Sequence, residues 1–520
     1  MMIPMTKTLA VFFLIAVVSC SEKKTTAPDG ARNYYLSTSG SDDNDGSKEH
    51  PWKTMDKLNA VRFNGGDTIF FTSGETFAGN FQLDSFNSGS AAQPLVITSN
   101  GNSKAIIDGK NSTALTVYSS GFVTIYNLQF TGAGRKDGNT KDGVAIRYCH
   151  DIIIDDIDIK GFQKAGLLIY ECTDVKVTKV YAHENGFAGI SVQGDYQKRT
   201  TQKIHIANCK AENNPGDPTN LTNHSGNGIL AGNCKNVLIE YCTATNNGWD
   251  MPRKGNGPVG IWCYEADSVT IQHCISYGNK TAKGAADGGG FDLDGGVTHS
   301  VIQYCLSYGN EGAGFGIFQY AGASNWHDNT IRYNISENDG MGSTAGAGVY
   351  IWNSSRDTAQ FKRCFFYNNV VYNDKGACIS YSVESEQSQF YFLNNIFVAK
   401  DTIIIGKEST GIFLANNWWS IQNGFNIDGI KDLTTWATQK GKEKLNGKLV
   451  GLNSNPQFTN PGNAALTLPS QLTSFNNYML PANSPLRTGG LNIQQQFGIA
   501  NGGKAFHQNN APVNGIGACF

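Results

Sequence analysis

The sequence predicts an all-β fold, a solenoid of parallel strands, on three observations. Short segments of alternating apolar and β-branched residues recur at intervals near 30, and this pattern runs from about residue 95 to about residue 420. Sixty glycines and 11 % aromatic residues accompany only 16 % charged residues, which is typical of a turn-rich β protein. No helical period separates the strands, so each repeat needs its neighbours to bury its apolar face.

The amino terminus predicts export. A lysine precedes an apolar run that is too short for a stable membrane span, and "VVSC" ends that run. This ending resembles a bacterial lipobox, which implies that residues 1–20 are a lipoprotein signal peptide and that Cys20 is acylated. Plain secretion with an incidental Cys20 is the alternative. We expect residues 21–32 to form a flexible tether and residues 33–520 to form one domain.

Four cysteines close the same pattern in successive repeats, at intervals of 33, 32 and 31. Equivalent positions in successive repeats stack, so we expect a ladder of small buried side chains rather than disulfides. The segments "KIHIANC", "VLIEYC", "VTIQHC" and "SVIQYC" end at Cys209, Cys242, Cys274 and Cys305. Asn334 and Cys364 are expected to continue this ladder. Five residues after each of the four cysteines stand Asn214, Asn247, Asn279 and Asn310, whose amides are expected to bond from coil to coil.

Each repeat also holds a second strand that opens with glycine, as in "VGIWCYE", "GGFDLDG" and "AGVYIWN". Side chains alternate across a strand, so its apolar members give the register. The inward set is Ile190, Val192, Ile229, Ala231, Ile261, Cys263, Phe291, Leu293, Phe315, Ile317, Val349 and Ile351. The outward set is Trp262, Tyr264, Asp292, Asp294, Phe318, Tyr350 and Trp352. Because coils lie about 4.8 Å apart, the outward set should form one contiguous surface.

Three features of the sequence together cover about residues 33–520. The domain opens with "YYLSTSGSDDNDGSKEHPWKTM", the coils follow, and "YMLPANSPLRTGG" and "NGIGACF" end it. In these features the sequence resembles the right-handed parallel β-helix superfamily, which contains pectate lyases, other polysaccharide lyases and several glycoside hydrolases. The resemblance implies a right-handed, single-stranded parallel β-helix that carries a catalytic site and ends in a short irregular extension. Between residues 421 and 449, "DLTTWATQKGKEKLNGK" suggests a short helix packed on the coil end.

The stretch "DGGGFDLDGG" predicts the centre of the site. Asp292 and Asp294 extend from one face of a strand, about 6.6 Å apart, and aromatic residues border them. Such a surface suits a saccharide, because rings stack on pyranoses while carboxylates and amides bind hydroxyls. Three alternatives remain: a turn role for the aspartates, a protein contact or loop-covered patch, and a calcium site made by Asp287, Asp292 and Asp294.

Two long turns supply further candidates. Residues 246–260, "NNGWDMPRKGNGPVG", place Trp249, Arg253 and Lys254 where they can close over the surface. The preceding turn supplies His224. The alternative for Arg253 and Lys254 is a solvated loop without a functional role. The alternative for His224 and His183 is that they are simple polar turn residues. The expected substrate-binding residues are Trp262, Trp249, Phe318, Tyr350, Trp352 and His183.

The first expectation for the reaction is β-elimination on a uronic-acid sugar, as a polysaccharide lyase or an oligosaccharide dehydratase. Arg253, or a bound cation such as calcium, would neutralise the substrate carboxylate. Lys254, His224 or Tyr264 would remove the C5 proton.

Hydrolysis is the alternative, with Asp292 and Asp294 as acid and as base or nucleophile. The polygalacturonase strings "NTD", "GHG" and "RIK" are absent, and "DD" occurs only outside the proposed surface. The third hypothesis is a carbohydrate-binding or adhesion β-helix without catalytic activity.

The partners follow from these expectations. The net charge of −2 gives no hint of nucleic acid. We expect a monomer held by its lipid anchor on the outer membrane of a Gram-negative bacterium. It would act on an acidic poly- or oligosaccharide during extracellular polysaccharide breakdown.

Overall fold

The computed structural model describes residues 25–26, 30–344, 346–382, 386–406, 411–500 and 502–520. The predicted signal peptide and Cys20 lie outside these residues. Within the described part of the chain, no helix combines the length and the apolar character needed to cross a membrane.

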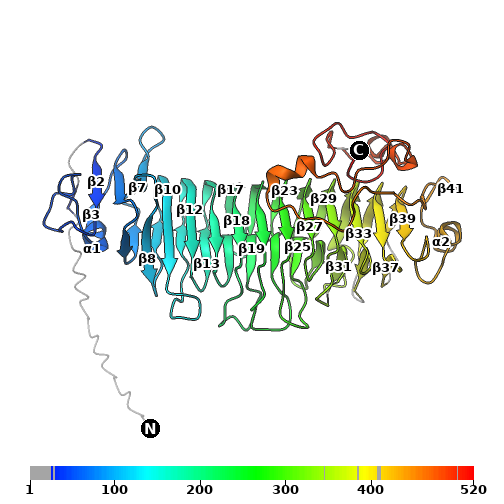
Figure 1. Cartoon of the computed structure of the whole chain (residues 1–520), viewed down its shortest axis with the longest axis horizontal. Coiled ribbons are helices and arrows are strands. Elements are labelled where there is room, and N and C mark those ends of the chain that lie inside the picture. The colour runs from blue at the N-terminus through cyan, green and yellow to red at the C-terminus, as the bar shows by residue number, and fades with distance from the viewer. Residues whose placement is uncertain (1–24, 27–29, 345, 383–385, 407–410, 501) are drawn as a thin grey trace, which may run out of the picture.

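The chain winds into an elongated parallel β-helix, as the repeat interval predicted (Figure 1). One side is a 12-stranded sheet in which every neighbouring pair is parallel. Its strands are β6 (Phe81–Leu83), β9 (Leu115–Tyr118), β11 (Val144–Arg147), β13 (Ala165–Tyr170), β16 (Ala188–Gln193), β19 (Asn227–Gly232), β22 (Val259–Tyr264), β25 (Gly289–Leu293), β28 (Phe315–Gln319), β31 (Val349–Asn353), β34 (Ile379–Tyr381) and β37 (Ile404–Ile405). These are the glycine-led second strands of the sequence repeats.

The remaining coil strands form two further rows, joined by the long strands β10 and β12, which run through both. The first row is β2 (Asn33–Leu36), β4 (Thr68–Thr72), β7 (Leu95–Asn100), β10 (Gly121–Gly132), β12 (His150–Lys160), β14 (Thr173–Thr178), β17 (Thr201–Ala207), β20 (Cys234–Glu240), β23 (Asp267–Gln272), β26 (Val301–Gln303), β29 (Trp326–Arg332), β32 (Phe361–Tyr367), β35 (Ser388–Leu393) and β38 (Ile412–Leu414). The second adds β5 (Thr76–Ala78), β8 (Ala105–Lys110), β15 (Tyr181–His183), β18 (Lys210–Glu212), β21 (Thr243–Thr245), β24 (Ile275–Tyr277), β27 (Leu306–Tyr308), β30 (Ile335–Glu337), β33 (Val370–Asn373), β36 (Ile396–Ala399) and β39 (Asn417–Ser420).

The core lies inside the coils. All twelve residues of the predicted inward set are fully buried, so the register read from the sequence is confirmed. On neighbouring strands, Ile261 pairs with Phe291 and Phe291 with Phe315. Burying one such side chain stabilises the fold by about 1.5–3 kcal/mol, so the stacked interior fixes which residues face outward.

The predicted asparagine ladder is also confirmed. The side-chain amide of Asn247 donates to Asn279 Oδ1 at 2.9 Å, Asn279 donates to Asn310 at 2.9 Å, and Asn310 donates to Asp339 at 2.8 Å. This ladder explains the glycine that opens each second strand. A Cβ on Gly290 would lie only 2.2 Å from Ser307 Oγ and 3.0 Å from Asn310 Nδ2.

The cysteine ladder is confirmed in part. Every cysteine within the described residues is buried and free. The backbone N–H of Cys305 donates to Asn334 Oδ1 at 2.9 Å, so Asn334 continues the ladder. Cys364 does not, because the next coil is longer: Asn334 is followed 35 residues later by Asn369, and Cys364 pairs with Asn329.

Short elements close the ends. Helix α1 (Met55–Asn59) and the pair β1 (Thr25–Thr26) and β3 (Val61–Arg62) lie near the first coils (Figure 1). The predicted helix is α2 (Leu433–Lys440), whose buried Trp436 packs on Trp418 at 5.5 Å between ring centroids. It is followed by the hairpin β40 (Lys444–Leu445) and β41 (Lys448–Leu449).

Residues 453–520 form an irregular extension that folds back along the second row (Figure 1). It contains the 3-10 turns η1 (Pro469–Ser474) and η2 (Pro485–Arg487) and helix α3 (Ile493–Phe497). Tyr478 fixes it by donating a 2.6 Å hydrogen bond to the buried Glu337.

Candidate functional site

A cavity of about 690 Å³ lies on the outer face of the 12-stranded sheet. Its floor comes from β22, β28 and β31, and its walls come from turns that flank these strands and their neighbours β16, β19 and β25. The loops that carry His224, Asn256 and Asp287 extend from one edge of the solenoid (Figure 1). The lining residues are Tyr196, Asn223, His224, Asn256, Trp262, Tyr264, Ala286, Asp287, Asp294, Phe318, Tyr320, Thr344, Tyr350 and Trp352.

Five aromatic residues predicted from the outward register line this cavity together. They are Trp262, Tyr264, Phe318, Tyr350 and Trp352. The expectation of an exposed aromatic surface is corrected, because the turns enclose it: Trp262 is 3 % exposed and Phe318 is 7 % exposed. The rings are held in place. Trp262 Nε1 donates to Asn227 Oδ1 at 3.1 Å, and Phe318 makes edge contacts with Tyr350 and Trp352.

Two carboxylates line the cavity, Asp287 and Asp294. Burial raises the pKa of Asp294 to about 7, assisted by the negative charges of Asp287 and Glu265 and opposed by the N–H of Gly295, which donates at 2.7 Å. Burial raises the pKa of Asp287 only to about 6, because the N–H of Gly257 donates to it at 2.7 Å and Arg253 lies nearby. The two environments therefore give Asp294 the higher pKa of the two acids.

Asp292 leaves the same face of β25 but is not among the lining residues. It is 2 % exposed, and its Oδ1 atom is buried without a hydrogen-bond partner among the described residues. Its carboxylate lies over Gly316 on the neighbouring coil, where an added Cβ would come within 2.9 Å of it. Burial and the charges of Asp294 and Asp287 raise its pKa well above the usual range, so the site favours the neutral acid over the carboxylate.

His224 and Tyr264 enter the cavity as predicted. Burial, assisted by the positive charge of Arg253 and opposed by the hydrogen bond to Asn227, lowers the pKa of His224 to about 4. Its Nδ1 lies 3.0 Å from the Asn227 side-chain amide, so the neutral ring presents Nε2–H as a donor. Tyr264 donates to Gln193 Oε1 at 2.8 Å, and burial raises its pKa. Neither group is a strong proton acceptor at neutral pH.

Besides Asp292, four predicted residues do not line the cavity. Arg253 donates to the carbonyl of Asn256 at 2.9 Å, and Lys254 is exposed. Trp249 is 46 % exposed and donates to Asn213 on the second row. His183 belongs to β15, where it pairs with Asp158 at 3.0 Å. The expected closure of Trp249 and Lys254 over the surface is therefore not seen, because Trp249 bonds to Asn213 and Lys254 is exposed, although Asn256 of the same turn does line the cavity.

The sequence reasoning missed Tyr196, Tyr320, Asn223 and Asn256. Tyr320 could have been found, since it follows the outward Phe318 by two positions and alternation places it on the same face. The other three stand in turns, where no strand period gives the direction of a side chain.

The predicted calcium ligands do not form a compact set. Among the described residues, the group of three ligand side chains within a common 4.8 Å is His299, His327 and Asp328, and not Asp287, Asp292 and Asp294. The calcium prediction remains untested.

A family model described as "Pel9A-like, right handed beta helix region" matches residues 34–347, more than half of the chain. A search of curated proteins finds no match. Among solved structures the chain is similar to pectate lyase Pel9A, at 14 % identity over 95 % of this chain and 98 % of that one, with a TM-score of 0.43.

It is also similar to a GH136 lacto-N-biosidase from Eubacterium ramulus, at 17 % identity over 65 % of this chain and 64 % of that one, with a TM-score of 0.43. The alignment thus spans less than two thirds of that relative. An alginate lyase from Paenibacillus sp. str. FPU-7 aligns at 14 % identity over 73 % of this chain and 96 % of that one, with a TM-score of 0.33. At these identities the likenesses concern the fold alone.

Proposed function

Because the chain belongs to the Pel9A-like, right-handed β-helix family, we propose that it is a saccharide-degrading enzyme whose cavity hydrolyses glycosidic bonds. One observation carries the proposal. Asp287 and Asp294 line the same aromatic cavity, and burial raises the pKa values of both toward neutrality. Paired carboxyl groups with separated pKa values are the requirement for glycoside hydrolysis.

The environments assign the two roles. Asp294 has the higher pKa, about 7, and serves as the general acid that protonates the departing glycosidic oxygen. Asp287 has the lower pKa, about 6, and acts as an ionised carboxylate. It either takes a proton from the attacking water or attacks the anomeric carbon itself, in which case water later releases the sugar. Both routes consume one water for each bond that is broken.

The rest of the cavity suits a neutral sugar. Trp262, Phe318, Tyr350 and Trp352 supply apolar surface for pyranose faces. His224 Nε2–H, Asn223 and Asn256 supply polar groups for hydroxyls. No lysine or arginine is among the described lining residues, so a uronate would place its charge beside Asp287 and Asp294 without a compensating cation.

Elimination on an acidic saccharide is the second candidate. Arg253 lies close enough to lower the pKa values of Asp287 and His224, so a modest turn movement would bring it to a substrate carboxylate. The family description also refers to Pel9A, and Pel9A is a pectate lyase. For either reaction, we propose that the protein acts from the outer membrane through an acylated Cys20.

The test is a product assay on neutral and acidic oligosaccharides with four proteins: the parent chain, D294N, D287N and the control D174N. Asp174 is exposed and pairs with Lys203, so its change leaves the cavity intact. We expect D294N and D287N to lose activity by about 10²–10⁴-fold and D174N to retain it. Full activity in both cavity variants, with unchanged circular dichroism, would contradict the proposal.

A further inference from the structure

A second group of titratable side chains lies on the first row of strands, apart from the cavity described above. Its two histidines border an open hollow of about 420 Å³. His299 lies just before β26, and His327 and Asp328 lie in β29 on the next coil. Among the described residues, none lines both this hollow and the saccharide cavity.

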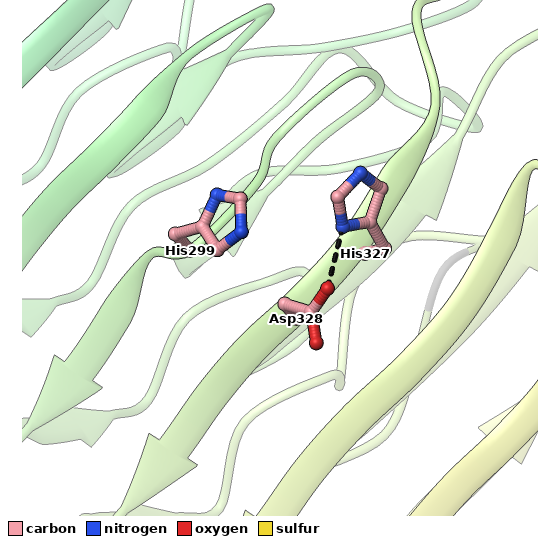
Figure 2. A group of neighbouring side chains, drawn as sticks. All are labelled: His299, His327 and Asp328. Atoms are coloured by element: carbon pink, nitrogen blue, oxygen red, sulfur yellow. Dashed lines mark hydrogen bonds and ion pairs between the residues drawn. The ribbon is translucent and has the colours of Figure 1, made fainter.

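We propose that His299, His327 and Asp328 bind a divalent transition metal, with zinc the best match. One ligand atom from each residue lies within 4.8 Å of the other two. Figure 2 shows a ring nitrogen of His299 directed toward the space between His327 and Asp328. The separation is short enough for one ion to draw the three atoms to bonding distances of about 2.0–2.2 Å through side-chain rotation.

The two coils hold the ligands in register. The backbone of Thr298 forms a parallel β-bridge with Asp267 on one neighbouring coil and another with His327 on the other. His299 then donates its backbone N–H to the carbonyl of His327 at 3.3 Å. The imidazoles sit edge to face, with 5.4 Å between their centroids. The backbone therefore brings the rings together before any ion arrives, which reduces the ordering that a metal must impose.

A carboxylate outside the set orients His299. Nδ1 of His299 lies 2.8 Å from Asp267 Oδ1, and Asp267 also accepts hydrogen bonds from Thr298 and Ser268. With Nδ1 engaged, Nε2 is the nitrogen left for a metal. Carboxylate–imidazole pairs of this kind fix the tautomer and raise the basicity of a metal ligand.

The other two ligands share a proton that a metal would replace. His327 Nδ1 lies 2.7 Å from Asp328 Oδ2 (Figure 2). Arg363 Nε forms an ion pair with the other oxygen, Asp328 Oδ1, at 2.6 Å. This ion pair holds the carboxylate in place, so Oδ2 stays directed toward His327. Arg199 also lines the hollow, and it donates to the carbonyl of Gly296 at 2.7 Å.

The donor set selects the metal. Two imidazole nitrogens and one carboxylate oxygen suit zinc, copper or nickel, whereas calcium requires six or more oxygen ligands. Three protein ligands leave a fourth tetrahedral position for water. The side chain of His299 is 57 % exposed, so an ion can enter from solvent.

The test is calorimetric titration of zinc chloride into the full chain, purified without a histidine tag and stripped with a chelator. We expect one saturable site per chain, and at least about a hundredfold weaker binding in H299Q, H327Q and D328N. D267N should weaken binding by about 10–100-fold, since it alters only the orienting carboxylate.

His150 supplies the matched control. It is an exposed histidine whose Nδ1 lies 2.9 Å from Asp151, a histidine–aspartate pair without a second imidazole. H150Q should therefore bind zinc like the parent chain. Absence of saturable binding by the parent chain would overturn the proposal, and so would equal weakening by H150Q and H327Q. Cobalt titrated in place of zinc gives a visible spectrum that reports coordination independently of calorimetry.

Discussion

Asp292 in β25 and Asp294, the first residue after that strand, leave the same face of the sheet, yet only Asp294 lines the cavity. The difference arises on the next coil, where Gly316 leaves space that the Asp292 carboxylate fills. Asp292 is thereby buried outside the cavity, and its neighbour Asp294 shares the cavity with Asp287 from the preceding turn. The catalytic pair that we propose therefore combines a residue directly after β25 with a residue of the turn before it.

The pH dependence of the reaction follows from this pair. Activity needs Asp287 ionised and Asp294 protonated, and their pKa values are about 6 and about 7. We expect a bell-shaped profile of kcat/KM that peaks between these values and falls on both sides. Initial rates across pH 4 to 9 check it. A profile that keeps rising above pH 8 would instead contradict the assignment of Asp294 as the acid.

Stability should also depend on pH through Asp294. Its pKa in the folded chain, about 7, exceeds its ordinary value of 3.8. Between these values the folded chain binds more protons than the unfolded chain, so the free energy of unfolding falls as pH rises. We expect the Tm to drop from pH 5 to pH 8, and to drop less in D294N by about 2 °C or more. Thermal unfolding of both proteins measures this, and identical drops would refute it.

Two tryptophans give a matched test of substrate binding. Trp352 lines the cavity, whereas Trp249 lies outside it and is half exposed. We expect W352A to raise KM about tenfold or more, equivalent to ~1.4 kcal/mol of lost contact. W249A should leave KM nearly unchanged. Steady-state kinetics on one oligosaccharide compares them, and a larger effect from W249A would mean that the turn closes over the substrate after all.

We expect the asparagine ladder to contribute to the thermal stability of the coils. N279A would remove the acceptor of one N–H of the Asn247 side-chain amide, which now donates to Asn279 Oδ1 at 2.9 Å, while the bond from that amide to the Ala211 carbonyl remains. Each buried group left unpaired costs about 1–3 kcal/mol, so we expect a clear fall in Tm. N102A, at an exposed position in a turn, is the control. Equal Tm values for the two variants would show that water replaces the lost bonds.

The sequence predicts the coils well because their signal is local. Phe291 and Leu293 face inward and Asp292 and Asp294 leave the opposite face, as period-two alternation requires. Alternation does not give the burial of Asp292, which depends on Gly316 one coil away. Nor does it place Trp249 or Asn256, because turn residues have no period. His183 shows a third limit: it stands on a strand, but in a row that faces away from the cavity.

The most direct test of hydrolysis is to run the reaction in water labelled with heavy oxygen while following product mass and ultraviolet absorbance. We predict that each cleavage places one labelled oxygen in a product and leaves the absorbance unchanged, and that D294N abolishes both cleavage and labelling. Products without label, accompanied by the new absorbance of an unsaturated uronate, would contradict hydrolysis and establish elimination at this cavity.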